Sequence, residues 1–495
     1  MGVMPVGRLL ATMSVPIMIS MLVQALYNVV DSMFVSRIDE YALTALSMAF
    51  PIQNLMIAMA AGLGVGLNAV LSRALGAKDQ ESVSRAAASG MLLMAVCSVV
   101  FMLGGATIAR PFYEAQTDIP EIIDYGESYT RIVMLGCVGV FFQIHFERTL
   151  QSTGRTVLTM ISQGLGAIIN IILDPIMIFG LFGMPRMGVA GAAVATIIGQ
   201  WIAAFVGLFM NLRLNPEVPL GLRHFRIHGP TLRRILAIGL PSVAMQSIGS
   251  VMTFAMNQIL IAFSSTAVAV FGVYFKLQSF IFMPVFGLNN GTVPIIAYNY
   301  GARKPERMRQ TIRYGVCAAV IIMAAGTLLF HAVPGQLLRI FDASQEMLRI
   351  GIPALRIISL SFPIAGFCIG CGAVFQALGY SIYSMIISMV RQLVVLIPCA
   401  YLIGRLTNNV TMVWWAFVVA EVFSLLLTAR FYRKVDQNVI RPLGSAQPLS
   451  PRGEGGFSVF TLFCKKDGLR SAKRGRSLGR TSRTPSSRLW LVFAG

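Results

Sequence analysis

The chain has 495 residues, of which 56% are hydrophobic and 12% charged, and its mean hydropathy is +0.72. These values exclude an ordinary soluble domain and indicate a membrane protein with many spans. The formal net charge of +20 does not indicate a nucleic-acid partner, because the basic residues gather in connections between apolar segments and near the C-terminus.

Long apolar segments alternate with short polar connections along most of the chain. Taking about 20 residues as the length that crosses the hydrocarbon of a bilayer, we expect about twelve transmembrane helices. The connections at 73–85 and 213–234 are basic, whereas the one at 114–127 is acidic. Because cytoplasmic loops retain Lys and Arg, this asymmetry predicts that both termini lie in the cytoplasm.

An internal repeat relates the two halves of the chain. Pro16 in S-V-P and Pro241 in G-L-P lie 225 residues apart. The same shift maps Phe50, Gln53, Gly62, Gly66 and Gly154 onto Phe275, Gln278, Gly287, Gly291 and Gly379. One ungapped shift over this distance indicates a duplication. Since each half holds six spans, the repeat is parallel, and the two halves should face each other across a cleft.

The predicted fold is therefore an all-α polytopic membrane protein with twelve transmembrane helices in two pseudo-symmetric six-helix lobes. We expect an N-terminal lobe at 1–212, a cytoplasmic connector at 213–230 and a C-terminal lobe at 231–435. The composition changes to Ser, Gly, Pro and Arg after the last span, so residues 436–495 are expected to form a basic, disordered cytoplasmic tail.

The stretch 170–180, read N-I-I-L-D-P-I-M-I-F-G, places an aspartate inside an apolar segment. On a helix, Asn170 and Asp174 project from one face, one turn apart. A carboxylate inside hydrocarbon usually faces protein, water or a cation, and it often marks an ion path. The stretch therefore predicts a cation site, and the alternative is an aspartate that caps a broken helix or pairs with a basic neighbour. Helix kinks are expected at three prolines: Pro16, Pro175 and Pro241.

Polar residues in two further spans fit the same site. Asn28 and Asp31 share a face of the first span, although Asp31 lies near its end and an interfacial, solvated acid is the alternative. Thr196 in the sixth span supplies a hydroxyl, although such threonines usually bond to their own helix. Two carboxylates with amide and hydroxyl oxygens suit either a proton or a sodium ion.

The two lobes differ in charge although they share a layout. The positions aligned with Asp31 and Asp174 are Met256 and Cys399, so the second lobe lacks matching acids. Our candidates for the substrate cleft come from both halves: Tyr27, Asn28, Lys276 and Gln278. Arg391 in the eleventh span and Glu421 in the twelfth are further candidates to line the cleft, and for Arg391 the alternative is a side chain that snorkels to an interface.

Cys368 and Cys371 form C-I-G-C in a predicted span. The spacing is found in metal and redox sites, but no second pair accompanies it, so packing between helices is the favoured interpretation. We expect no metal beyond a possible Na⁺ and no cofactor.

Several short motifs together resemble the multidrug and toxic compound extrusion (MATE) family, in its bacterial MepA-like and DinF-like branch. They are S-V-P, Y-N-V-V-D-S-M-F-V, the glycine-rich end of the second span, Q-S-T-G-R with Q-A-L-G-Y, and N-I-I-L-D-P-I-M-I-F-G. The resemblance implies a V-shaped pair of lobes in the inner (plasma) membrane of a bacterium. It carries the family's first-lobe cation site onto four residues: Asp31, Asn170, Asp174 and Thr196.

The resemblance also implies a secondary active antiporter. Such a protein exports amphipathic, often cationic compounds in exchange for H⁺ or Na⁺ by alternating access, and thereby confers antibiotic resistance. Its expected partners are these small molecules and the bilayer, and we expect a monomer. The alternative is a flippase for lipid-linked saccharides, which would use a cationic cavity. An enzyme is not expected, because we find no paired-histidine metal motif and no nucleophile with an evident base.

Overall fold

The computed structural model describes residues 1–220, 228–341 and 343–445, and every regular element in these ranges is a helix. The first half contains α1 (Val6–Ser36), α2 (Glu40–Gly76), α3 (Gln80–Glu114), α4 (Pro120–Leu135), α5 (Val138–Ser152), α6 (Thr156–Phe179), the short η1 (Leu181–Gly183) and α7 (Val189–Leu214). The second half contains α8 (Gly229–Ile261), α9 (Ser265–Gly301), α10 (Pro305–Ala332), α11 (Pro334–Arg339), α12 (Gln345–Ser359), α13 (Phe362–Ala377), α14 (Ser381–Met389), the π-helix η3 (Val390–Leu396), α15 (Ile397–Thr407), α16 (Val410–Val413), α17 (Trp415–Val435), η4 (Asp436–Ile440) and α18 (Arg441–Ser445).

The predicted number of spans is confirmed. Among the described residues ten helices are long and apolar enough to cross a membrane, or twelve if each of two bent pairs is one span. The bent pairs are α4 with α5, at 44°, and α12 with α13, at 46°. In the second pair Pro363 lies in the first turn of α13, where its missing N–H prevents the hydrogen bond that would continue α12.

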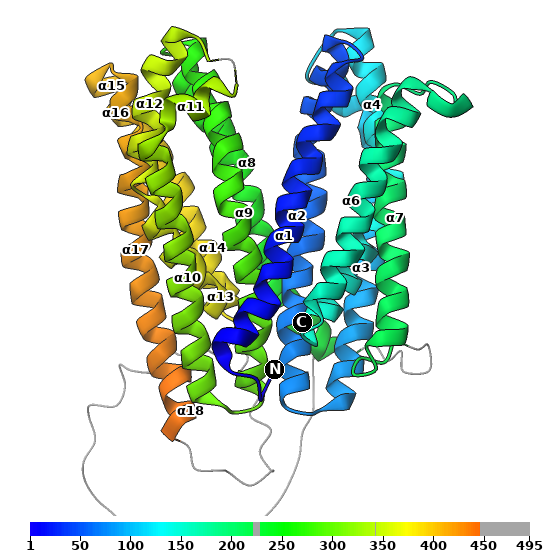
Figure 1. The fold of residues 1–495 in the computed structure, drawn as a ribbon, viewed down its shortest axis with the longest axis vertical. Helices are drawn as coiled ribbons and strands as arrows, with labels where there is room; N and C mark the ends of the chain where they lie inside the picture. The colour runs from blue at the N-terminus through cyan, green and yellow to red at the C-terminus, as the bar shows by residue number, and fades with distance from the viewer. Residues whose placement is uncertain (221–227, 342, 446–495) are drawn as a thin grey trace, which may run out of the picture. The chain divides into compact units, whose positions relative to one another are not determined.

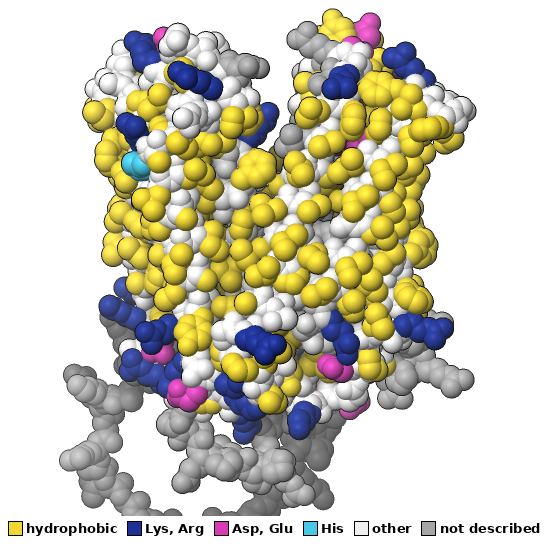
Figure 2. Space-filling view, viewed as in Figure 1, with side chains coloured by type: hydrophobic (Ala, Val, Ile, Leu, Met, Phe, Trp, Pro, Cys, Tyr) yellow, Lys and Arg dark blue, Asp and Glu magenta, His cyan; other side chains and the backbone are white. Residues whose placement is uncertain are grey.

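Within residues 1–445 the helices form two lobes, α1 to α7 and α8 to α17 (Figure 1). Figure 2 shows a notch between the lobes at the end opposite the start of the chain, and a broad hydrophobic band across both lobes on the face in view. Large hydrophobic side chains that are exposed in the described residues include Leu328, Ile321 and Val100. An apolar belt of this kind is expected for a surface that faces lipid.

The first part of the first helix of each lobe packs against the other lobe. Met13 of α1 is 1% exposed and belongs to the apolar core of the second lobe. Ile235 of α8 is fully buried against Leu67 and Leu71 of α2. The reciprocal exchange follows from the sequence repeat, because equivalent helices pack in equivalent places.

Glycines allow the helices of the two lobes to approach closely. A Cβ placed at Gly62 of α2 would lie 2.6 Å from the backbone nitrogen of Val243 in α8. A Cβ placed at Gly287 of α9 would lie 2.7 Å from Cα of Met18 in α1. Both the glycines and the residues that they meet are related by the shift of 225 residues, so the seam between the lobes has the same pseudo-symmetry as the sequence. This agrees with the helix-packing role of small residues in membranes.

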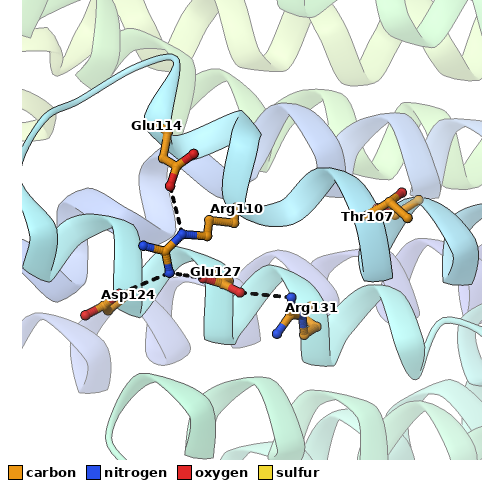
Figure 3. A network of polar contacts seen from close by, with 7 residues as sticks. Thr107, Arg110, Glu114, Asp124, Glu127 and Arg131 are labelled. Carbon is orange, nitrogen blue, oxygen red and sulfur yellow. Dashed lines mark hydrogen bonds and ion pairs between the residues drawn. The ribbon is translucent and has the colours of Figure 1, made fainter.

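Three acidic residues at the connection between the third and fourth spans form a local network with two arginines (Figure 3). Arg110 of α3 contacts Glu114 at 2.7 Å, Glu127 of α4 at 3.1 Å and Asp124 at 4.0 Å. Glu127 also pairs with Arg131 at 2.9 Å. All of these groups except Glu127 are largely exposed, so each pair stabilises the fold little, but together they link α3 to α4.

The helical unit extends beyond the predicted start of the disordered tail, which corrects that part of our prediction. Helix continues from α17 through η4 and α18 to Ser445. Ile440 is 1% exposed in the second-lobe core, and Arg441 pairs with Asp436 at 2.7 Å, which explains why this segment is ordered. Residues 446–495 lie outside the described residues.

Asp79 begins α3 by capping its first turn. Its carboxylate accepts hydrogen bonds from the Ser82 hydroxyl at 2.6 Å and from the Ser82 N–H at 3.0 Å. These bonds, led by the one from the hydroxyl, hold the pKa of Asp79 below its usual value. The stabilisation is therefore present above the unfolded-state pKa and is lost as the pH falls through the lower, folded-state pKa.

We expect Asp79→Ala to lower the free energy of unfolding by about 1 kcal/mol near neutral pH. Asp79→Asn should retain most of the cap but lose its pH dependence. Thermal unfolding of the purified protein at neutral and acidic pH measures both effects, and Asp118→Ala, at an exposed position in the next connection, serves as the control. Equal stability of Asp79→Ala and the control at neutral pH would contradict the capping role.

Candidate functional site

The α6 helix places Asn170 and Asp174 on one buried face, as the spacing predicts. Asp174 is fully buried and Asn170 is 3% exposed. The Asn170 Nδ2 donates to Asp174 Oδ1 over 3.4 Å, a long hydrogen bond. The helix continues through Pro175 to Phe179 and ends where Gly180 adopts a left-handed conformation, with φ of 74°. Asp174 is thus inside a continuous helix and does not cap a broken one.

Close packing of α6 on α7 brings Thr196 to the same place. A Cβ at Gly199 of α7 would lie 2.7 Å from the carbonyl oxygen of Gly166 in α6, so only residues without side chains fit at this crossing. Asn170 Nδ2 lies 3.3 Å from Thr196 Oγ1 and donates to it. Thr196 therefore takes part in a contact between helices.

Asp31 approaches this cluster from α1. The residue is half-buried, and its Oδ1 is buried without a hydrogen-bond partner. Asp31 and Tyr27 both lie within electrostatic range of Asp174. Because α1 packs against α6, Asp31 lies on the same side of the lobe as the α6 residues, although it is near the end of the predicted first span.

Two residues at this cluster were not singled out from the sequence as site residues. Tyr129 of α4 lies within electrostatic range of Asp31 and Asp174, and its hydroxyl accepts a hydrogen bond from Gln53 Nε2 of α2 at 2.8 Å. Both side chains come from helices far away in sequence. The repeat marks Gln53 as the partner of Gln278, but no sequence signal marks Tyr129, and only the packing of α2 and α4 brings the two side chains into contact.

The cluster has unused oxygen atoms and lacks a fixed positive charge. Asp31 Oδ1, Asn170 Oδ1 and Asp174 Oδ2 are buried without a hydrogen-bond partner. Throughout the described part of the chain, neither aspartate forms an ion pair. No set of three or more His, Cys, Asp or Glu side chains with metal-site geometry occurs in the same ranges. The donor set of carboxylate, amide and hydroxyl oxygens therefore fits a proton or one monovalent cation.

The other predicted residues occupy separate positions. The side chain of Asn28 lies outside the described residues. Lys276 is exposed on α9, in the other lobe, with its Nζ 5.9 Å from the ring centre of Phe341, and Gln278 is half-buried on the same helix. Their role in a substrate cleft stays a prediction. Each of the three prolines expected to kink a helix lies inside a continuous one: Pro16 in α1, Pro175 in α6 and Pro241 in α8.

Two expectations for the second lobe are resolved by its contacts. Arg391 forms an ion pair with Glu421 at 2.7 Å, which favours a position inside the lobe over the alternative of snorkelling to an interface. Cys368 accepts a hydrogen bond from the Ser424 hydroxyl at 3.4 Å, and Cys371 is 1% exposed in the apolar core. Both cysteines are free thiols packed between helices.

Comparison with known proteins gives one consistent result. The multidrug export protein MepA of Staphylococcus haemolyticus (strain JCSC1435) is 26% identical over 84% of this chain and 90% of its own length. The probable multidrug resistance protein YoeA of Bacillus subtilis (strain 168) is 26% identical over 87% of this chain and 94% of its own. The structure of an outward-facing multidrug resistance MATE family transporter of the MOP superfamily superposes with a TM-score of 0.82 at 27% identity, covering 88% of this chain and 96% of that one.

A crystal structure of MATE in complex with MaL6 gives a TM-score of 0.83 at 26% identity, over 89% of this chain and 97% of that one. The family model MatE matches twice, at residues 16–176 and 241–402. The two matches begin at the prolines that define the sequence repeat, and together they cover most of the two lobes. This chain belongs to the MatE family.

Proposed function

We propose that this protein is a secondary active multidrug efflux antiporter. It exports amphipathic, often cationic compounds in exchange for H⁺ or Na⁺ by alternating access. Multidrug export is the activity named for the staphylococcal relative, which matches over most of both chains. The relatives are membrane transporters, and a role in antibiotic resistance follows from export of such compounds.

The observation that carries the proposal is the pair of carboxylates in the first lobe, which has no basic partner among the described residues. Asp31 and Asp174 lie within electrostatic range of each other, and each has a buried oxygen without a partner. Two carboxylates in an apolar surrounding are costly unless a mobile proton or cation neutralises them. Such an ion drives transport only if it binds one conformation of the lobes more tightly than the other. The coupling site of the proposal comprises Asp31, Asn170, Asp174 and Thr196.

The distribution of charge supports an orientation. Lys304 Nζ donates to the carbonyl oxygen of Gly2 at 2.9 Å, and Arg307 Nη2 donates to that of Met1 at 3.0 Å, so the basic connection after α9 lies beside the start of the chain. We propose that this end is cytoplasmic in the inner (plasma) membrane of a bacterium and that the protein acts as a monomer. The notch of Figure 2 then opens to the outside.

The test is efflux of ethidium from proteoliposomes that contain the purified protein. A pH gradient or a sodium gradient is imposed separately, and dye release is followed by fluorescence. We expect release driven by one of the two gradients and abolished when that gradient is collapsed. If neither gradient drives release, and the protein instead moves a lipid-linked saccharide between leaflets, the flippase alternative is correct.

A further inference from the structure

The second lobe contains one charged pair deep inside its helices. Arg391 of η3 donates from Nη1 to Glu421 Oε1 of α17 at 2.7 Å. The Glu421 side chain is 9% exposed, and Tyr274 of α9 and Cys368 of α13 lie within electrostatic range of its carboxylate. The carboxylate therefore belongs to the interior of the lobe, and the guanidinium approaches it from η3.

Not all hydrogen-bonding groups of the pair have partners. In a purely structural ion pair they would all be expected to have them. Glu421 Oε2 is buried without a hydrogen-bond partner. Arg391 carries five N–H donors, of which one contacts Glu421, and a quarter of its side chain remains exposed. Burial of charge in this state costs free energy that an apolar pair would avoid. Charged residues retained inside a membrane protein usually serve a substrate or ion path.

Glu421 of this pair occupies the place in the second lobe that Thr196 has in the first, whereas Arg391 corresponds to Gly166, one helical turn before Asn170. Glu421 lies 225 residues after Thr196, the shift that relates the two halves. In the first lobe α6 and α7 are bridged by Asn170 and Thr196, and in the second lobe the equivalent helices are bridged by Arg391 and Glu421. Arg391 is held on a π-helical turn, and such turns are frequent at functional sites.

The charged side chains beside the two bridges differ, since only the second lobe places a guanidinium there. In the described residues the first lobe contains carboxylates without a basic partner. The second lobe contains a guanidinium that is hydrogen-bonded to Glu421. Lys276 of α9 adds an exposed ammonium in the same lobe. An arginine that faces hydrocarbon is costly, so the open side of Arg391 is expected to face the water-filled space between the lobes. Guanidinium groups with free donors bind planar carboxylates and phosphates.

We propose that Arg391, positioned by Glu421, is a binding site for the anionic group, carboxylate or phosphate, of amphipathic compounds that enter the cleft. This inference goes beyond the proposed export of cations. It depends on the transport proposal only in that the cleft admits small molecules. The protein would then take zwitterionic and anionic compounds as well, with the coupling ion in the first lobe and the anionic group of the substrate in the second.

Binding of three fluorescent probes to the purified, detergent-solubilised protein tests the proposal. The probes are 6-carboxyfluorescein for the carboxylate, flavin mononucleotide for the phosphate, and ethidium as the cation, and fluorescence polarisation gives each dissociation constant. The informative variant is Arg391→Gln/Glu421→Gln, because the neutral pair avoids a buried unpaired charge. We expect its affinity for at least one anionic probe, relative to ethidium, to fall about tenfold or more.

Two further variants separate binding from general effects of charge. Arg391→Lys should give an intermediate loss, because it keeps the charge but not the planar donors. Arg405→Gln removes an exposed charge from the same span and should bind the anions as the wild type does. Wild-type anion affinity in the double variant, confirmed as folded by gel filtration and circular dichroism, would overturn the proposal. So would a wild-type protein that binds neither anionic probe. Because no gradient is applied, these results are independent of the ion-coupled efflux test.

Discussion

Asp174→Asn is expected to abolish gradient-driven efflux of ethidium while the protein remains folded. The substitution keeps the shape of the side chain and removes the charge that would hold a proton or sodium ion. Hydrogen bonds to charged groups contribute about 1.5–3 kcal/mol, so we expect coupled transport to fall by at least about tenfold. Folding should persist because a neutral amide is less costly than a carboxylate at this fully buried position. Dye release from proteoliposomes under an imposed gradient measures the effect.

Asp124→Asn is the matched control for this experiment. Asp124 is also a helical aspartate, but its side chain is 72% exposed and it lies at the surface network of Figure 3. Its variant should transport as the wild type does. Asp31→Asn should behave like Asp174→Asn, since the two carboxylates share one site. Normal coupling in both Asp31→Asn and Asp174→Asn would show that the ion binds elsewhere.

The α6 residues could be predicted from sequence because their relation is local. Asn170 and Asp174 lie one helical turn apart in an apolar segment, so the helix alone places both on one face. Thr196 was also found, although its contact depends on how α7 packs against α6. The fold was predictable for a similar reason, since hydropathy marks each span and the shift from Pro16 to Pro241 divides the spans into two equal sets.

The residues that were missed depend on contacts between distant helices. Tyr129 and Gln53 come from two spans, and neither is unusual in its own segment. The pairing of Arg391 with Glu421 was also missed, because the sequence around Arg391 does not show that Glu421, thirty residues later, contacts it across the lobe. One signal was present, since the repeat maps Glu421 onto Thr196. A polar position in one lobe thus predicts where to look in the other, although the chemistry differs.

Gly287→Ala is expected to lower the free energy of unfolding by about 1–3 kcal/mol, because it inserts a methyl group into a closely packed contact. The new Cβ would lie 2.7 Å from Cα and 2.8 Å from the backbone nitrogen of Met18, and backbone atoms cannot turn aside as a side chain does. Gly272→Ala is the control on the same helix, since a Cβ there meets no atom within 4 Å. It should be neutral or slightly stabilising, because alanine favours helix over glycine. Thermal unfolding of the purified variants compares the two.

The same substitution should also change which conformation is populated, because the glycine seam joins α1 to α9 in this structure, whose lobes are apart at the end opposite the start of the chain. In the proposed alternating-access cycle this contact separates when the end near the start of the chain opens, so the methyl group penalises the present state and spares the one that is open at that end. A penalty of about 1.4 kcal/mol would shift the ratio of the two states tenfold. Distances between spin labels on the two lobes should then show a larger open fraction at the end near the start of the chain. Gly62→Ala should act in the same direction, because it meets Val243 across the repeat-related contact. An unchanged distance distribution in both variants would mean that the two lobes do not separate along this seam.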